Sequence, residues 1–193
     1  MSIVNHLETN LGEISEGWKD AAAADNLRVI RFACQPFEGA STFSTLGLSD
    51  SPMQFPGGDV CAQELLFAAW DSYPASKVAS FLLTFAEYVR SQSRALLRGE
   101  VFGPSTPLIP GVAANGVYAS LPAIYPDELA CYRASKPPAI LVWLVPLIGR
   151  ECEIVRRNGW GDFEKLLESS NPDLLDLDRP SLVGGEGDSC GGV

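Results

Sequence analysis

The apolar positions of this sequence are most continuous in residues 140–145, which read Ile-Leu-Val-Trp-Leu-Val. The run is rich in β-branched and aromatic residues and is too short to span a membrane, so it predicts a β-strand. Because both faces of this strand are apolar, we expect it at the centre of a sheet, with a covering layer on each side. We expect the strand to end at Pro146, since proline lacks the N–H that a ladder needs.

Helical periodicity is clearest in residues 75–98. The apolar stripe of this stretch consists of Val78, Phe81, Leu82, Phe85, Val89 and Leu96. Such a stripe is typical of a helix that packs one face on a core. Pro74 fits the first turn, and Gly99 is expected to end the helix. The pattern therefore predicts one long helix across a face of the central sheet.

Shorter patterns predict the other elements. Helices are predicted over residues 2–11, 149–157 and 162–169. Strands are predicted over residues 27–37, 41–50, 63–70 and 117–124, with a helical turn as the alternative for 63–70. Ser2 and Asp162 are the expected N-caps of the first and last helices. Charged residues in 27–37 favour a place near the sheet edge, and Gly47 indicates a bulge or a close backbone approach.

These elements predict an α+β fold: a single domain with a mixed or mainly antiparallel central sheet covered by helices. The length of 193 residues is within the usual range for one domain. We expect the domain to comprise residues 1–181. Residues 182–193 are rich in glycine and acidic residues, and this composition predicts a flexible tail.

Acidic residues are concentrated at the two ends of the chain. The net charge of −10 argues against nucleic-acid binding, because phosphates attract clustered Lys and Arg. Residues 27–161 are balanced in charge, whereas residues 1–26 and 162–193 carry the excess. One interpretation is a solvated surface that keeps the protein soluble, and the other is an acidic face for a basic protein partner. The candidate contacts on that face are Glu164, Glu168, Asp173, Asp176 and Asp178.

No motif in the sequence has the pattern of a catalytic or metal-binding site. The five cysteines include no C-x-x-C pair, and His6 is the single histidine, so we expect no metal. Residues 187–192, GDSCGG, resemble the nucleophile segment of a trypsin-like protease, but Cys190 interrupts the motif and no suitable histidine accompanies it. The first residues lack the basic region of a signal peptide. We therefore expect a cytoplasmic protein without catalytic residues, cofactor or membrane partner.

Four stretches within residues 41 to 181 resemble the Suppressor of Fused domain family and occur in the family's order. They are Thr45-Leu46-Gly47-Leu48-Ser49-Asp50, Glu64-Leu65-Leu66-Phe67, the segment LVWLVPLIGRE with Pro146 and Glu151, and Asp176-Leu177-Asp178-Arg179-Pro180-Ser181. Ile148 stands where the family often carries a threonine, a departure that bears on the hydrogen bonding of that turn. The resemblance implies the family's fold and a protein-binding role.

Single-domain bacterial members of this family look like immunity proteins, which neutralise a toxin by binding it. The resemblance therefore implies an immunity protein with a toxin domain as its partner. One alternative is a peptide-binding regulatory adaptor. Another is a small enzyme that uses Cys61 or a carboxylate pair such as Glu151 with Glu153. We also expect the strand over 27–37 to pair with an extended segment of the partner.

Overall fold

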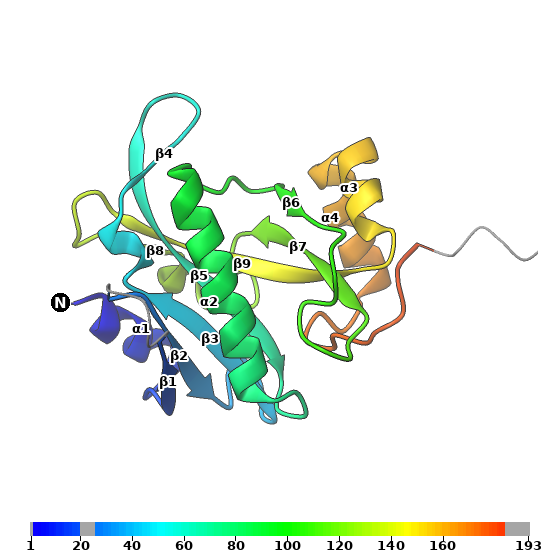
Figure 1. Cartoon of the computed structure of the whole chain (residues 1–193), viewed down its shortest axis with the longest axis horizontal. Helices are drawn as coiled ribbons and strands as arrows, with labels where there is room; N and C mark the ends of the chain where they lie inside the picture. The colour runs from blue at the N-terminus through cyan, green and yellow to red at the C-terminus, as the bar shows by residue number, and fades with distance from the viewer. Residues whose placement is uncertain (1, 20–25, 184–193) are drawn as a thin grey trace, which may run out of the picture.

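The computed structural model describes residues 2–19 and 26–183 as an open sheet with helices on both faces (Figure 1). The helices are α1 (Ile3–Leu11), α2 (Ala75–Gln92), α3 (Glu151–Asn158) and α4 (Trp160–Ser170), with short 3-10 helices η1 (Leu48–Asp50) and η2 (Asp127–Ala130). The strands are β1 (Glu16–Trp18), β2 (Arg28–Ala33), β3 (Ala40–Leu46), β4 (Met53–Gln54), β5 (Val60–Trp70), β6 (Val101–Phe102), β7 (Ala114–Ser120), β8 (Cys131–Tyr132) and β9 (Ala139–Ile148). None of the described helices is both long and apolar enough to cross a membrane.

The strands form one mixed sheet in the order β1-β2-β3-β5-β9-β7-β6, with β4 beside β5 and β8 beside β9. The pairs are antiparallel except for β5 with β9, where residues 62–66 run parallel to residues 139–143. The predicted α+β fold with a mixed sheet is therefore confirmed. The strand predicted to be central, β9, has neighbours on both of its edges.

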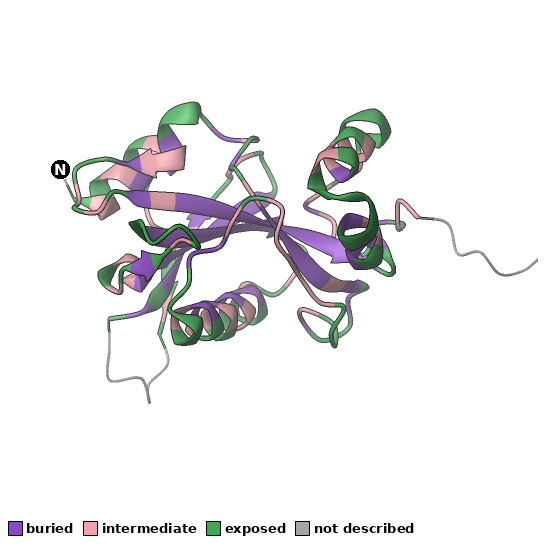
Figure 2. Ribbon diagram, turned by 90° about the horizontal axis from the view of Figure 1, so that it is seen from above, coloured by how far each residue is buried: buried purple, intermediate pink, exposed green. Residues whose placement is uncertain are grey.

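The sheet separates two apolar cores (Figure 2). Helix α2 packs on one face, while α1, α3 and α4 pack on the other. Alternate residues of β9 enter the two cores: Val142 and Leu144 lie on the α2 side, and Trp143 and Val145 lie on the opposite side. Trp143 is only 3% exposed. Both faces of β9 are thus buried, as its continuous apolar sequence predicts.

The prediction that this strand ends at Pro146 is wrong, because β9 continues to Ile148 with Pro146 opposite Val117 of β7. The physical reason lies in the neighbouring strand. Pairing of β5 with β9 stops at Trp143, so β9 has one unpaired edge where Pro146 lies. A proline is tolerated where a strand has a free edge, since no ladder bond is lost there. The carbonyl of Pro146 accepts a hydrogen bond from Arg179 instead of from a strand.

The long helix also ends earlier than its periodicity predicts. Helix α2 stops at Gln92, and Ser93 adopts a left-handed conformation with φ of 50°. Beyond it the chain pairs with β4, since the Gln54 N–H donates to the Ser93 carbonyl and the Ala95 N–H donates to the Gln54 carbonyl. These tertiary hydrogen bonds replace helical ones, so Gly99 does not act as the helix stop.

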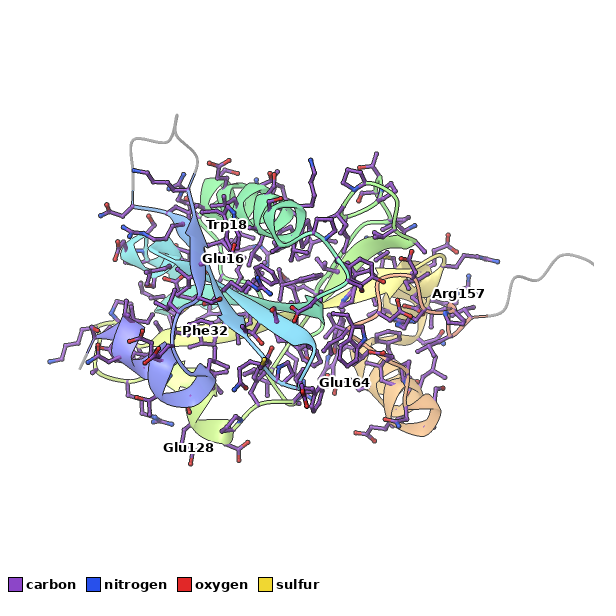
Figure 3. All side chains as sticks on the ribbon, turned by 90° about the horizontal axis from the view of Figure 1, so that it is seen from below. Glu16, Trp18, Phe32, Glu128, Arg157 and Glu164 are labelled. Atoms are coloured by element: carbon purple, nitrogen blue, oxygen red, sulfur yellow. The ribbon has the colours of Figure 1, made fainter. Side chains whose placement is uncertain are left out.

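The strand over 27–37 is not the edge of the sheet. It is shortened to β2, and the three residues of β1, which the sequence pattern does not predict, pair along its outer side. Figure 3 labels Glu16 and Trp18 on this extra strand. Where β1 is paired, β2 has no free ladder positions for a partner. Its predicted role in strand addition is therefore confined to the ends that β1 leaves uncovered.

Of the predictions for turns and caps, those at Ser2 and Gly47 are confirmed and the one at Asp162 is wrong. Ser2 caps α1 as predicted, with its hydroxyl accepting from the Asn5 N–H at 3.2 Å. Gly47 has φ of 98°, and a Cβ there would lie 2.7 Å from the Asn26 carbonyl oxygen, so the close backbone approach is confirmed. Asp162 is not an N-cap, because α4 begins two residues earlier at Trp160.

The predicted tail, residues 182–193, falls almost wholly outside the described residues. Leu182 and Val183 are described, and both are partly buried. The backbone N–H of Leu182 donates to the carboxylate of Glu151. Leu182 and Val183 therefore pack on the domain, and the boundary at 181 stays a prediction.

Candidate partner-binding site

A buried carboxylate, Glu64, ties β5 to the turn between β3 and η1. It is fully buried, and it accepts hydrogen bonds from the Thr45 hydroxyl at 2.5 Å, from the Gly47 N–H at 3.0 Å, and from both the N–H and the hydroxyl of Ser49. Burial raises the pKa of Glu64, whereas these donors oppose the rise. A buried polar group in such a complete set of partners stabilises one arrangement of the turn.

A second buried carboxylate, Glu151, begins α3 and pairs with Arg179. The two are 0% and 3% exposed, and the guanidinium spans both carboxylate oxygens at 2.7 and 2.8 Å. The same carboxylate accepts from the N–H groups of Ile148 and Leu182, and Arg179 also donates to the carbonyl of Pro146. The pair thus fastens the C-terminal segment to the end of β9.

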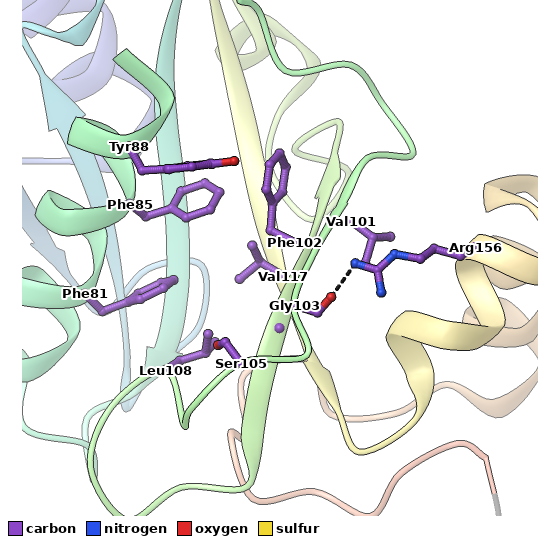
Figure 4. A pocket seen from close by; sticks show the side chains of 11 residues that line it. Phe81, Phe85, Tyr88, Val101, Phe102, Gly103, Ser105, Leu108, Val117 and Arg156 are labelled. Atoms are coloured by element: carbon purple, nitrogen blue, oxygen red, sulfur yellow. Dashed lines mark hydrogen bonds between the residues drawn. The ribbon is translucent and has the colours of Figure 1, made fainter. Parts of the chain in front are cut away.

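An open groove lies between α2 and the short strand β6 (Figure 4). Its volume is about 480 Å³. We call it the α2–β6 groove, and its main lining residues are Phe81, Phe85, Tyr88, Phe102, Leu108 and Val117. Rings from α2 meet Phe102 edge to face, with centroids 5.2 Å from Phe85 and 6.0 Å from Tyr88. Tyr88 remains 46% exposed although it belongs to this aromatic cluster.

The groove runs beside the end of the sheet. Within the described residues β6 is the last strand in the order, and it pairs with β7 alone. On the side of α3, the Arg156 guanidinium donates to the carbonyl of Gly103, directly after β6. An edge strand next to exposed aromatic rings offers main-chain hydrogen bonds and side-chain contacts to the same ligand.

The predicted acidic contacts fall into two groups. The first consists of Asp173, Asp176 and Asp178, which fasten the C-terminal segment to the end of β5 and to the turn before α2. The Asp173 carboxylate accepts from the Trp70 indole N–H at 2.7 Å, and the Tyr73 hydroxyl donates to Asp176 at 2.6 Å and to Asp178 at 3.1 Å. Burial and these two carboxylates raise the pKa of Tyr73. Each of the three thus already has an intramolecular partner.

The second group lies on α4. Glu164 accepts from the Tyr118 hydroxyl at 2.7 Å and pairs with Arg98. Glu168, one turn later, is exposed and has no hydrogen bond or ion pair to another described residue. The structure therefore does not gather the five acids into one unpaired face. Contact of any of them with a partner stays a prediction.

The chain is similar in sequence and in fold to proteins of one family. A sequence profile described as Suppressor of fused protein (SUFU) matches residues 23–180. The chain belongs to the Suppressor of Fused family. The immunity protein YqcF of Bacillus subtilis (strain 168) is 22% identical over 173 residues, which cover 89% of this chain and 88% of that protein.

Solved structures of this family share the fold. A Suppressor of Fused homologue from Neisseria gonorrhoeae superposes with a TM-score of 0.75 at 14% identity, covering 94% of this chain and 95% of that one. A chain of the Sufu–Fu complex gives 0.71 at 15% identity, with 93% and 90% covered. Drosophila Suppressor of Fused gives 0.71 at 16% identity, and the match spans 93% of this chain and 50% of that larger one.

The stretches that resemble the Suppressor of Fused family meet in the two buried networks. Thr45, Gly47 and Ser49 from the first stretch surround Glu64 from the second. Glu151 from the third stretch pairs with Arg179 from the fourth. These family residues therefore hold the fold together, and they lie apart from the α2–β6 groove. One signal for the Glu64 network is visible in the sequence, namely an acid inside the mostly apolar strand β5.

The residues considered for catalysis do not form a catalytic arrangement in this family member. Cys61 is buried, and burial raises the pKa of its thiol, so little reactive thiolate forms. Glu151 pairs with Arg179, whereas Glu153 pairs with Arg150, so the two carboxylates serve different partners. Residues 2–19 and 26–183 contain no group of three or more His, Cys, Asp or Glu side chains that could hold a metal ion.

Proposed function

We propose that this protein acts in the cytoplasm by binding another protein, and that it is an immunity protein which neutralises a cognate toxin by direct contact. The α2–β6 groove is the observation that carries the proposal. The family and a relative named as an immunity protein give the reason to consider a toxin as the partner.

The groove has the chemistry of a protein-binding site. Exposed aromatic side chains are the commonest energetic anchors of interfaces, because they bury a large area and lose little conformational freedom. Tyr88 is about half exposed and is supported from below by Phe85 and Phe102. A partner side chain placed among these rings would bury apolar surface that water now contacts. The neighbouring edge strand β6 would add main-chain hydrogen bonds.

The acidic residues contribute to encounter in this proposal. The net charge of −10 attracts a basic partner, and Asp173, Asp176 and Asp178 remain the candidate contacts on the C-terminal segment. Attraction between charges acts mainly on the association rate. Association should therefore slow as salt shortens the screening length to about 8 Å and below. The triple variant D173N/D176N/D178N should show a weaker salt dependence, with its folding checked because the three carboxylates have internal partners.

A regulatory adaptor is the second candidate function, because an open groove beside a sheet edge also fits an extended peptide. The two functions differ in partner and in consequence. An immunity protein protects growing cells from a toxin encoded next to its own gene. An adaptor binds its partner without any such protection.

A matched pair of variants tests the groove. Tyr88→Ala removes an exposed aromatic ring inside the groove, and Phe37→Ala removes an equally exposed ring, 52% against 46%, in the turn between β2 and β3. A partner is first isolated by affinity purification from the native host, and neighbouring genes are cloned for co-expression. We expect Tyr88→Ala to weaken partner binding about tenfold or more and to lower protection, as for an interface anchor.

The control variant tests whether the loss of any exposed ring has the same effect. Phe37→Ala should bind and protect like the unchanged protein. Equal binding by both variants would show that the groove is not the interface. Binding of a partner without protection against any neighbouring gene product would reject the immunity role and leave the adaptor role.

A further inference from the structure

A second cleft lies on the face of the sheet opposite α2, between α4 and the turn that follows β7. Its volume is about 300 Å³. We call it the α4 cleft, and its lining residues include Leu121, Ile124, Trp143, Leu167, Leu174 and Glu168. It shares no lining residue with the α2–β6 groove. Binding at one site therefore does not require the other.

The cleft is apolar inside and open at Leu121. Leu121 is 48% exposed, and few other large apolar side chains among the described residues are exposed to this extent. Ile124, Leu167 and Leu174 are only partly buried around it. An aliphatic side chain that entered the cleft would cover all four, and removing this surface from water favours binding.

The rim carries an uncompensated negative charge. Arg98 and Glu164 also line the cleft, but they neutralise each other as an ion pair. Glu168 has no such partner among the described residues. A cation next to the aliphatic side chain of a ligand would complement Glu168, and the acidic C-terminal segment adds to the attraction.

One lining residue of the cleft, Trp143, carries a donor without an acceptor. The indole N–H of Trp143 is buried and makes no hydrogen bond to any described residue. Buried donors in folded proteins nearly always have a partner. Because Trp143 lines the cleft, its indole N–H signal can report a ligand that enters there.

We propose that the α4 cleft binds an extended segment of another protein in which a leucine-sized aliphatic residue is followed by lysine or arginine. The aliphatic side chain enters the cleft beside Trp143, and the cation meets Glu168. This site goes beyond the proposed function, since it adds a second contact for a basic partner on the opposite face of the sheet.

Peptide titration followed by NMR tests the proposal with the full chain. The probe is the heptapeptide acetyl-Gly-Ser-Leu-Lys-Arg-Ser-Gly-amide, added to the ¹⁵N-labelled protein at low salt. We expect the indole N–H signal of Trp143 to shift while that of Trp18, on β1, stays in place. Two control peptides replace leucine by serine or the Lys-Arg pair by Glu-Glu, and neither should cause these shifts.

Two charge-reversed variants separate the rim from general charge effects. Glu168→Lys should weaken binding of the probe about threefold to tenfold. Glu128→Lys makes the same change of charge at an exposed position of η2, which Figure 3 shows away from Glu164, and it should have little effect. Tyr88→Ala should bind the probe normally, because Tyr88 belongs to the α2–β6 groove. Failure of the groove and failure of the cleft are thus distinguishable.

Several outcomes would overturn the proposal. Absence of any Trp143 shift at millimolar probe would do so, as would equal binding by Glu168→Lys and Glu128→Lys. If N-acetyl-leucine amide binds as tightly as the probe, the cleft is a small-molecule pocket. If sedimentation shows a dimer that Leu121→Glu dissociates, the cleft instead binds a second copy of the chain.

Discussion

Replacing Arg179 with methionine should lower the free energy of unfolding by about 3–5 kcal/mol, the usual cost of removing one partner from a buried ion pair. The geometry of the ion pair favours a large loss within this range. Glu151 is fully buried, and its carboxylate is held by both terminal nitrogens of the guanidinium, at 2.7 and 2.8 Å. Methionine fills much of the volume but leaves this negative charge without its counter-ion.

Part of the loss is offset by groups that remain in place. The N–H groups of Ile148 and Leu182 still donate to the Glu151 carboxylate at 2.9 and 2.8 Å, so the charge is not wholly unsolvated. The loss remains large against the roughly 5–15 kcal/mol that holds a domain folded. We therefore expect a folded but much less stable protein, in which the C-terminal segment is the first part to detach from β9.

The assay is urea unfolding followed by tryptophan fluorescence, with ΔG taken from the linear extrapolation. The matched control is Arg150→Met, because Arg150 and Glu153 form an exposed ion pair at the start of the same helix. Exposed pairs contribute about 0–1 kcal/mol. The expected difference between the two methionine variants is therefore at least about 2 kcal/mol.

A double variant, E151L/R179M, tests whether the charge itself is the cause. It removes both charges, although it leaves the N–H groups of Ile148 and Leu182 without an acceptor. We expect the double variant to be less destabilised than the sum of the single variants by about 0.5–3 kcal/mol. A loss below about 1 kcal/mol for Arg179→Met, or strict additivity of the two changes, would refute the reasoning.

Three further predictions concern stability. Leu144→Ala should cost about 2–5 kcal/mol, since Leu144 is fully buried in the α2 core, and a loss below about 1 kcal/mol in urea unfolding would contradict this placement. Gly47→Ala should cost more than about 1 kcal/mol because of its φ of 98° and the clash with Asn26, whereas Gly57→Ala, which meets nothing within 4 Å, should be nearly neutral. Burial raises the pKa of Tyr125 above its ordinary value of about 10, so the folded protein retains a proton that the unfolded chain releases, and stability should fall as the pH rises above that value. Unfolding measured at pH 9 and pH 11 should show a smaller fall for Tyr125→Phe, and an equal fall would contradict the assignment.

Features that depend on neighbouring residues were predictable from the sequence. The continuous apolar run of β9 required burial on both faces, and the structure buries both. The cap at Ser2 and the close approach at Gly47 followed from local backbone chemistry. The apolar stripe of α2 predicted that the helix packs on the sheet, because apolar side chains at helical spacing lie on one face and that face is buried.

The ends of these elements were decided by tertiary structure. Periodicity extends α2 to residue 98, but hydrogen bonds with Gln54 draw the chain away after Gln92. Pro146 reads as a strand end, yet it lies within β9 because β5 has already separated from that edge. In both cases the position of a distant segment decided where the element ends, against the local signal.

The roles of the charged residues were also decided only by the fold. Nothing near Asp173 or Asp176 in the sequence shows that Trp70 and Tyr73 will donate to them. Glu151 looks like a surface acid, yet Arg179, 28 residues later, makes it part of the core. A carboxylate at the surface and one in a buried pair have the same local sequence pattern, because their energies are set by the distance to a counter-charge and by the loss of water, and only the folded chain determines both.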